Sequence, residues 1–115
     1  MKKVAVLILN RNLPKVTNKL YETISKNNKK LVDIFVIDSG SSKKKISKYT
    51  TWKPNSKEIM KKGLRYVRGM NYGLLQLWKE GKMKNYNSFL LITNDTEFPN
   101  PKFIKKLNNI LNRHK

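Results

Sequence analysis

The chain has 115 residues, with 26 lysines and arginines against seven aspartates and glutamates, and its formal net charge is +19. This length allows one domain with a modest core, and no apolar segment approaches the roughly 20 residues that span a bilayer. The absence of cysteine excludes disulfides and thiolate metal sites. The charge predicts attraction to polyanions such as nucleic acid, anionic lipid or phosphorylated substrates. Lysine and asparagine occur along the whole chain, however, so a compositional bias explains the charge equally well.

The first part of the chain has the pattern of a βαβ unit. Residues 4–9 form a continuous apolar run that predicts a buried strand, and residues 31–37 form a second run interrupted by Asp33. Between them, apolar residues at helical spacing predict a helix to about Lys26, with Pro14 in its first turn. Strand, helix and strand at this spacing require a right-handed crossover and a parallel strand pair.

The second part continues the alternation. Residues 48–52 predict a short third strand, and Asn55 or Ser56 can cap a short helix that Gly63 ends. Apolar residues at helical spacing predict a longer helix over residues 64–80. The run at residues 89–92 predicts a fourth strand buried on both faces, and residues 101–113 predict an amphipathic last helix. We expect Trp52 and Trp78 to lie in the core. The whole pattern predicts an α/β fold, with an open, mostly parallel sheet and helices on both faces.

Polar side chains follow three of the predicted strands, where the carboxyl ends of parallel strands share one edge of the sheet. We expect the carboxylate of Asp38 to accept hydrogen bonds from a base or ribose, and Asp95 to hold Mg²⁺ or Mn²⁺ against a diphosphate. Neither GxGxxG nor GxxxxGK[ST] occurs, so the remaining phosphate charge falls to arginines. The groups involved are Asn10, Arg11 and Asn12 after the first strand, Asp38 to Ser41 after the second, Asp95 and Glu97 after the fourth, and Arg65 and Arg68.

Structural interpretations of these acids stay open. Asp95 can simply start a turn, Asp38 can form an Asx-turn in the DSGS segment, and Glu97 can be a solvated loop residue.

Four segments, VAVLILNRN, VDIFVIDSGSS, RGMNYGL and LLITNDTEFPNP, resemble in order and spacing the first blocks of the inverting, family 2-like GT-A glycosyltransferases, which use nucleotide-diphosphate sugars. The resemblance covers roughly residues 4–101 and implies a Rossmann-like GT-A half-domain. It implies that the DxD-like motif falls on Thr93, Asn94 and Asp95, with Asp95 as the metal ligand and Glu97 assisting. It implies a nucleotide-sugar site formed by Leu9, Asn10, Arg11, Asn12, Asp38, Ser39, Gly40, Ser41, Arg68, Gly69, Asn71 and Asn94, with Gly73 in the same block as Gly69.

The chain departs from the family pattern at two points. Thr93 stands where the motif has its first acid, and no side-chain carboxylate follows Glu97, so a general base for the inverting displacement is missing. We therefore expect residues 1–115 to form a single nucleotide-sugar-binding domain without the acceptor half. It would be a fragment, a truncated gene product, or a minimal version that a partner subunit completes.

The resemblance leads to a set of functional expectations. We expect the chain to transfer a sugar to a glycan or lipid-linked acceptor in glycan biosynthesis. We also expect a cytoplasmic location with peripheral membrane association, and no binding to a specific nucleic acid. Two alternatives stay open: a non-enzymatic basic α/β domain that binds nucleic acid or an acidic membrane surface, and an inactive remnant that still folds.

Overall fold

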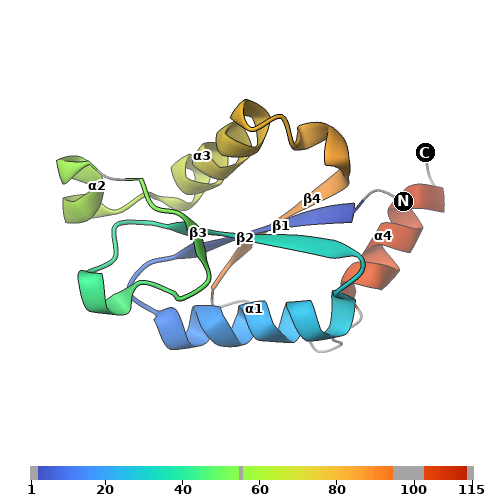
Figure 1. The fold of residues 1–115 in the computed structure, drawn as a ribbon, viewed down its shortest axis with the longest axis horizontal. Coiled ribbons are helices and arrows are strands. Elements are labelled where there is room, and N and C mark those ends of the chain that lie inside the picture. Colours follow the sequence, from blue (N-terminus) through green and yellow to red (C-terminus); the bar gives the residue numbers. More distant parts are fainter. Residues whose placement is uncertain (1–2, 55, 95–102, 114–115) are drawn as a thin grey trace.

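The computed structural model describes residues 3–54, 56–94 and 103–113, which form a four-stranded parallel sheet with helices on both faces (Figure 1). The spatial order of the strands is β3-β2-β1-β4, and each neighbouring pair runs parallel. The predicted α/β architecture is confirmed. The strands are β1 (Lys3–Asn10), β2 (Val32–Asp38), β3 (Thr50–Trp52) and β4 (Tyr86–Thr93).

The helices follow the predicted alternation, and their ends have local causes. Pro14 begins the first helix, because its fixed φ and missing N–H suit that position. The hydroxyl of Ser56 accepts a hydrogen bond from the Ile59 N–H (3.1 Å) at the start of the second, which Gly63 ends with a φ of 74°. The helices are α1 (Pro14–Asn28), α2 (Lys57–Lys62), α3 (Tyr66–Lys79) and α4 (Phe103–Arg113), with short 3₁₀ turns η1 (Lys43–Lys45) and η2 (Met83–Asn85).

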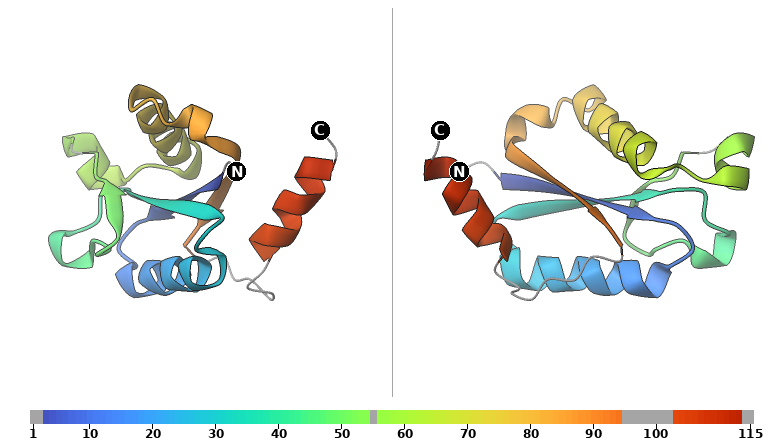
Figure 2. Two further views of the ribbon diagram at one scale, coloured as in Figure 1. Left: turned by 45° about the vertical axis from the view of Figure 1, so that its right-hand side comes forward. Right: turned by 180° about the vertical axis from the view of Figure 1, so that it is seen from behind.

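The core consists of two apolar layers, one on each face of the sheet. Strand β1 lies at its centre, where Ala5, Val6, Leu7 and Ile8 are fully buried. Alternate side chains of β1 face opposite layers, as the period of a strand requires. Helices α1 and α4 cover one face and α3 covers the other; Figure 2 shows the sheet between α1 and α3 from two further sides. None of the helices in the described ranges is long and apolar enough to cross a membrane.

Strand β4 differs from the prediction. It is an edge strand, and among its eight residues only Tyr86 and Ile92 are buried, so the expected burial on both faces is wrong. The apolar run of β4 resembles that of β1 because both carry aliphatic side chains on both faces. However, β1 has a neighbouring strand on each side, whereas β4 has a neighbour on one side. The expectation for Trp78 is also wrong: it is 67% exposed, because α3 turns Met70 and Leu77 toward the sheet. Trp52 is half-buried and stacks on Phe35, with ring centroids 5.3 Å apart.

Two glycines let α3 approach the sheet closely. A Cβ at Gly73 would lie 2.7 Å from Cδ2 of Leu7 and 2.8 Å from Cδ1 of Ile37, and a Cβ at Gly69 would lie 2.5 Å from Cδ1 of Leu9. Any side chain at these positions would have to push the helix or the strand residues away. The glycines of the RGMNYGL segment therefore set the distance between α3 and β1.

Candidate functional site

A buried hydrogen-bond network connects the carboxyl ends of β1 and β2. The Asn10 side chain is fully buried; its Nδ2 donates to Oδ1 of Asp38 (3.3 Å), and its Oδ1 accepts from the hydroxyl of Thr17 on α1 (2.8 Å). The backbone supports the same junction, since the N–H of Ser39 donates to the carbonyl of Asn10 (2.8 Å). Asn10 and Asp38 are paired residues in the strand register, so the parallel alignment itself brings these two side chains together.

The network continues to the end of β4. Nδ2 of Asn94, the residue after β4, lies 3.4 Å from the hydroxyl of Thr17, which is already bonded to Asn10. Side chains that follow three different strands thus meet at one edge of the sheet. Thr17 provides the link on α1. Thr17 was not among the expected site residues, although a polar residue on the same helix face as Leu20 and Ile24 was the signal for it.

The loop after β2 is held by its own side chains. Oδ2 of Asp38 accepts from the N–H of Ser41 (2.9 Å), and the hydroxyl of Ser39 donates to the carbonyl of Leu64 (2.7 Å). Gly40 has a φ of +76°, and a Cβ there would lie 2.1 Å from the carbonyl oxygen of Ile59, so the loop tolerates only glycine. Asp38, Ser39 and Ser41 are fully buried. The carboxylate of Asp38 therefore shapes the loop, as the structural interpretation proposed, and a ligand reaches it only if this loop moves.

The candidate arginines are exposed but partly occupied. Arg11 donates from Nη1 to the carbonyl of Lys62 (2.8 Å), so it caps the C-terminal end of α2. Arg68 lies 3.8 Å from Oε1 of Glu58, with both side chains about two-thirds exposed (64% and 66%). A pair of this length and exposure contributes little, on the order of 0–1 kcal/mol, so Arg68 can leave Glu58 for another anion at small cost. Arg65 is exposed immediately before α3.

Asn12 and Asn71 complete the candidate positions on the surface. Asn12 has a positive φ of 59°, its N–H donates to the hydroxyl of Ser41 (2.9 Å), and its Oδ1 accepts from the N–H of Ser42 (2.8 Å). The strand-one loop and the DSGS loop are thereby tied to each other. Asn71 is exposed on α3, and Leu9 is half-buried below Gly69.

The predicted metal ligands, Asp95 and Glu97, lie outside the described residues, so the structure does not place them. Within the described ranges, no group of three or more histidines, aspartates or glutamates lies together in a way that suits a metal ion. The described chain reaches Asn94, one residue before Asp95, at the polar network.

Comparisons of the chain with protein-family models, with curated proteins and with solved structures gave no match. The resemblance to the glycosyltransferases therefore rests on the four sequence segments, and the function that it implies is a proposal.

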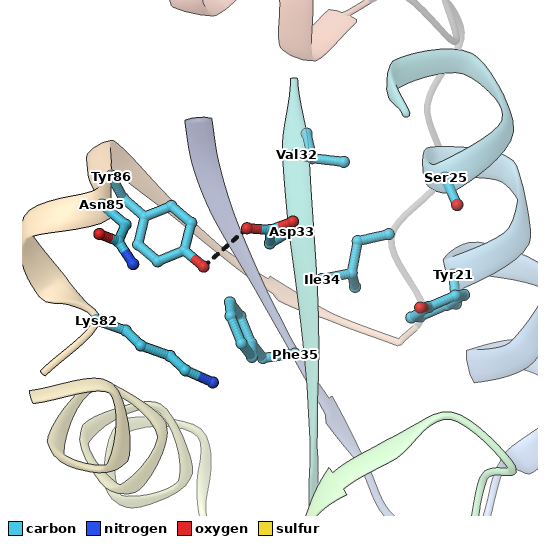
Figure 3. Close-up of a pocket in the computed structure, with 9 residues that line it drawn as sticks. All are labelled: Tyr21, Ser25, Val32, Asp33, Ile34, Phe35, Lys82, Asn85 and Tyr86. Atoms are coloured by element: carbon cyan, nitrogen blue, oxygen red, sulfur yellow. Dashed lines mark hydrogen bonds between the residues drawn. The ribbon is translucent and has the colours of Figure 1, made fainter. Parts of the chain in front are cut away.

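A cavity of about 510 Å³ lies away from these strand ends, along the amino half of β2 (Figure 3). Strand β3 pairs only with Val36 and Ile37, so the preceding part of β2 has an open edge. At one side of the cavity the hydroxyl of Tyr86 donates to Oδ2 of Asp33 (2.9 Å), and burial together with this bond raises the pKa of Tyr86 above its usual range. Lys3 contacts the other carboxylate oxygen of Asp33 (3.1 Å). Asp33, the one charge within an apolar run, was the sequence signal for this feature.

Proposed function

We propose that this chain is a glycosyltransferase-type domain that binds a nucleotide-diphosphate sugar at the carboxyl edge of its sheet. The observation that supports the proposal most is the hydrogen-bond chain Asp38–Asn10–Thr17–Asn94, which joins the ends of β2, β1 and β4 through α1. Open α/β sheets bind ligands at this edge. A buried polar network of this kind gives a rigid base on which exposed side chains can be held in fixed positions.

The exposed and half-buried residues around this base are the ones proposed to meet the ligand. Asn12 and Arg11 belong to the strand-one loop, and Arg68 and Asn71 belong to the start of α3. Arg68 is the best placed to neutralise a diphosphate, because its exposed contact with Glu58 is weak and its planar guanidinium suits phosphate oxygens. Arg11 keeps its contact with α2 and so orders the loop that carries Asn12.

The proposed reaction is an inverting displacement at the anomeric carbon. An acceptor hydroxyl attacks from the face opposite the diphosphate, a new carbon–oxygen bond forms, and the bond from the carbon to the diphosphate oxygen breaks. The hydroxyl proton passes to a carboxylate general base, and no residue of the strand-end network is assigned this role. Mg²⁺ or Mn²⁺ held by Asp95 would supply Lewis-acid stabilisation of the leaving diphosphate.

Calorimetric titration with UDP, GDP and dTDP tests the donor site. The titrations are run with and without Mn²⁺ at high salt, where general attraction between exposed charges is screened. We expect one nucleotide to bind with Mn²⁺ and this binding to be lost in Asp95→Asn. The control variant Glu22→Gln removes the same charge from the surface of α1 and should bind as the parent chain does.

Two results would contradict the proposal. The first is that no nucleotide binds to a chain shown by circular dichroism to be folded. The second is that all three nucleotides bind alike, without metal and only at low salt. The second result would favour the alternative of a non-enzymatic basic domain, which the net charge of +19 supports.

A further inference from the structure

A second cavity, of about 390 Å³, lies between the C-terminal end of α1 and helix α4. The strand-end network includes Asp38, the last residue of β2. The cavity lies at the opposite end of this strand, where it is lined by Leu31, the residue before β2. Seven residues of extended strand separate two points by about 20 Å, so the two features are distinct. The lining of the cavity combines lysines and asparagines from the end of α1 with Lys105, Asn108 and Asn109 of α4.

Among the residues that the structure describes, the charge around this cavity has a single sign. Four lysines, Lys26, Lys29, Lys30 and Lys105, line it, and none of the described acidic residues does. These lysines take no part in the ion pairs formed within the described ranges. All four side chains are exposed, so they can turn toward a ligand.

The acids nearest along the chain to Lys26, Lys29 and Lys30 are occupied elsewhere. Glu22, one turn before Lys26 on α1, contacts Nζ of Lys48 (3.6 Å) and accepts a hydrogen bond from the hydroxyl of Tyr49. Asp33 is held by Lys3 and Tyr86. It shares the sheet face of Phe35, which α3 covers, whereas the cavity lies on the side of α1 and α4. The lysines around the cavity therefore lack a local counter-charge in the described part of the chain.

The end of α1 does not cancel this charge. A helix C-terminus carries the equivalent of about half a negative charge, against four positive charges here. The amide groups of Asn27 and Asn28 donate back to the carbonyls of Thr23 (2.8 Å) and Ile24 (3.0 Å), so they are turned toward the helix. The lysine ammonium groups are therefore the main donors that a ligand in the cavity would meet.

Asn108 also lines this cavity, and it lines a small apolar cavity between α4 and β4 as well. The residue is 4% exposed, and its Oδ1 is a buried acceptor with no hydrogen-bond partner within the described residues, so a ligand reaches it when the side chain turns. Buried polar atoms are seldom left in this state, because a group that has lost its water without gaining a partner destabilises the fold. A ligand that carries a hydroxyl group as well as anionic oxygens would satisfy both Asn108 and the lysines.

From this combination we infer that the cavity between α1 and α4 is a binding site for a hydroxyl-bearing phosphate compound. Its volume falls in the range of small-ligand sites, roughly 300–1,000 Å³. Several lysines suit a ligand with more than one phosphate. The same chemistry occurs in a free sugar or inositol phosphate and in the head group of a phosphoinositide lipid. The inference does not depend on a nucleotide-sugar site.

The test uses inositol trisphosphate and a pair of matched variants, in buffer without divalent ions and at physiological salt. Lys30→Gln with Lys105→Gln removes two charges from the cavity. Lys79→Gln with Lys84→Gln removes two charges from the end of α3 and from η2, on the other face of the sheet. All four lysines are exposed, so both variants should keep the fold. We expect one binding site per chain and an affinity at least roughly tenfold lower in the cavity variant, the size of one lost charge-assisted hydrogen bond. The control variant should stay close to the parent.

Vesicles of phosphatidylcholine with phosphatidylinositol bisphosphate distinguish the two sources of ligand. Sedimentation with these vesicles that depends on Lys30 and Lys105 supports a head group as the ligand. Binding of inositol trisphosphate that depends on these lysines, without sedimentation, supports a free compound. Equal loss of affinity in the two double variants, or binding of several anions per chain, would show attraction by general charge and overturn the inference. A third variant, Asn108→Ala, should weaken inositol trisphosphate binding more than tripolyphosphate binding, because tripolyphosphate lacks an alcohol.

Discussion

Replacing Asn10 with alanine is expected to reduce the free energy of unfolding by about 2–6 kcal/mol. The substitution removes the acceptor of the Thr17 hydroxyl (2.8 Å) and the side-chain donor to Oδ1 of Asp38 (3.3 Å). All three side chains are fully buried, so water cannot replace the lost bonds without opening the structure. Each buried polar group left without a partner costs about 1–3 kcal/mol, and there are two of them. The loss is a large part of the roughly 5–15 kcal/mol that stabilises a typical domain.

Urea unfolding followed by tryptophan fluorescence measures this loss, because the stacking of Trp52 on Phe35 ends when the sheet opens. Asn71→Ala is the matched control: it makes the same change on the exposed surface of α3 and should shift the free energy by no more than about 0.5 kcal/mol. A double-mutant cycle of Asn10→Ala with Thr17→Val should give a coupling of about 0.5–3 kcal/mol. If Asn10→Ala unfolds like the control, or if the two substitutions are additive, the network does not stabilise the strand ends as argued.

Three further predictions concern packing and titration. Gly73→Ala should destabilise the fold by about 1–3 kcal/mol in urea unfolding, because the added methyl group overpacks the contact between α3 and the sheet. Gly81→Ala should cost about 1–2 kcal/mol from backbone strain alone, because Gly81 has open space around it but a φ of +70°. Tyr86 should ionise above the usual tyrosine range in an ultraviolet pH titration, since burial raises its pKa. Its contribution to stability is therefore present below about pH 10 and lost as the pH rises further; Tyr86→Phe should remove this loss. Glu80 should titrate below the usual glutamate range in carboxyl NMR spectra, because the hydrogen bond with Lys82 lowers its pKa. Its contribution is lost as the pH falls through that lowered value, and Lys82→Gln should return the pKa toward the usual range.

The fold could be predicted in most parts because its signals are local. The apolar run of β1, Pro14 at the start of α1 and Gly63 at the end of α2 each act on a few neighbouring residues, and all three elements form where expected. The position of β4 could not be predicted in the same way. An apolar run shows that a strand has two apolar faces, but whether the strand lies at the centre or at the edge depends on the order of all strands. The exposure of Trp78 has the same origin, because its apolar character does not say which side of α3 the sheet will cover.

Part of the polar network at the strand ends could be predicted from the sequence, but its burial could not. Asn10 and Asp38 are the last residues of neighbouring strands. The parallel pairing that the βαβ pattern predicts is therefore enough to bring them together. Their burial depends on the path of the DSGS loop, which closes over Asp38 through the bond from Ser41. The link through Thr17 depends on how α1 packs, and the capping of α2 by Arg11 depends on where two distant loops meet. These are tertiary contacts between segments that carry no shared motif.

The placement of the acids explains why selectivity must come from particular sites and not from the net charge. Four of the five acidic residues in the described ranges are paired with a lysine or arginine at the surface, and the fifth, Asp38, is buried. The remaining lysines therefore attract any polyanion, but this attraction extends only about 8 Å at physiological salt and does not distinguish one anion from another. A cavity adds what open surface lacks, because it holds several lysines around one volume and offers a buried polar atom such as Oδ1 of Asn108. Binding that survives high salt should therefore be confined to the polar edge of the sheet and to the cavity between α1 and α4, while binding elsewhere on the surface should disappear.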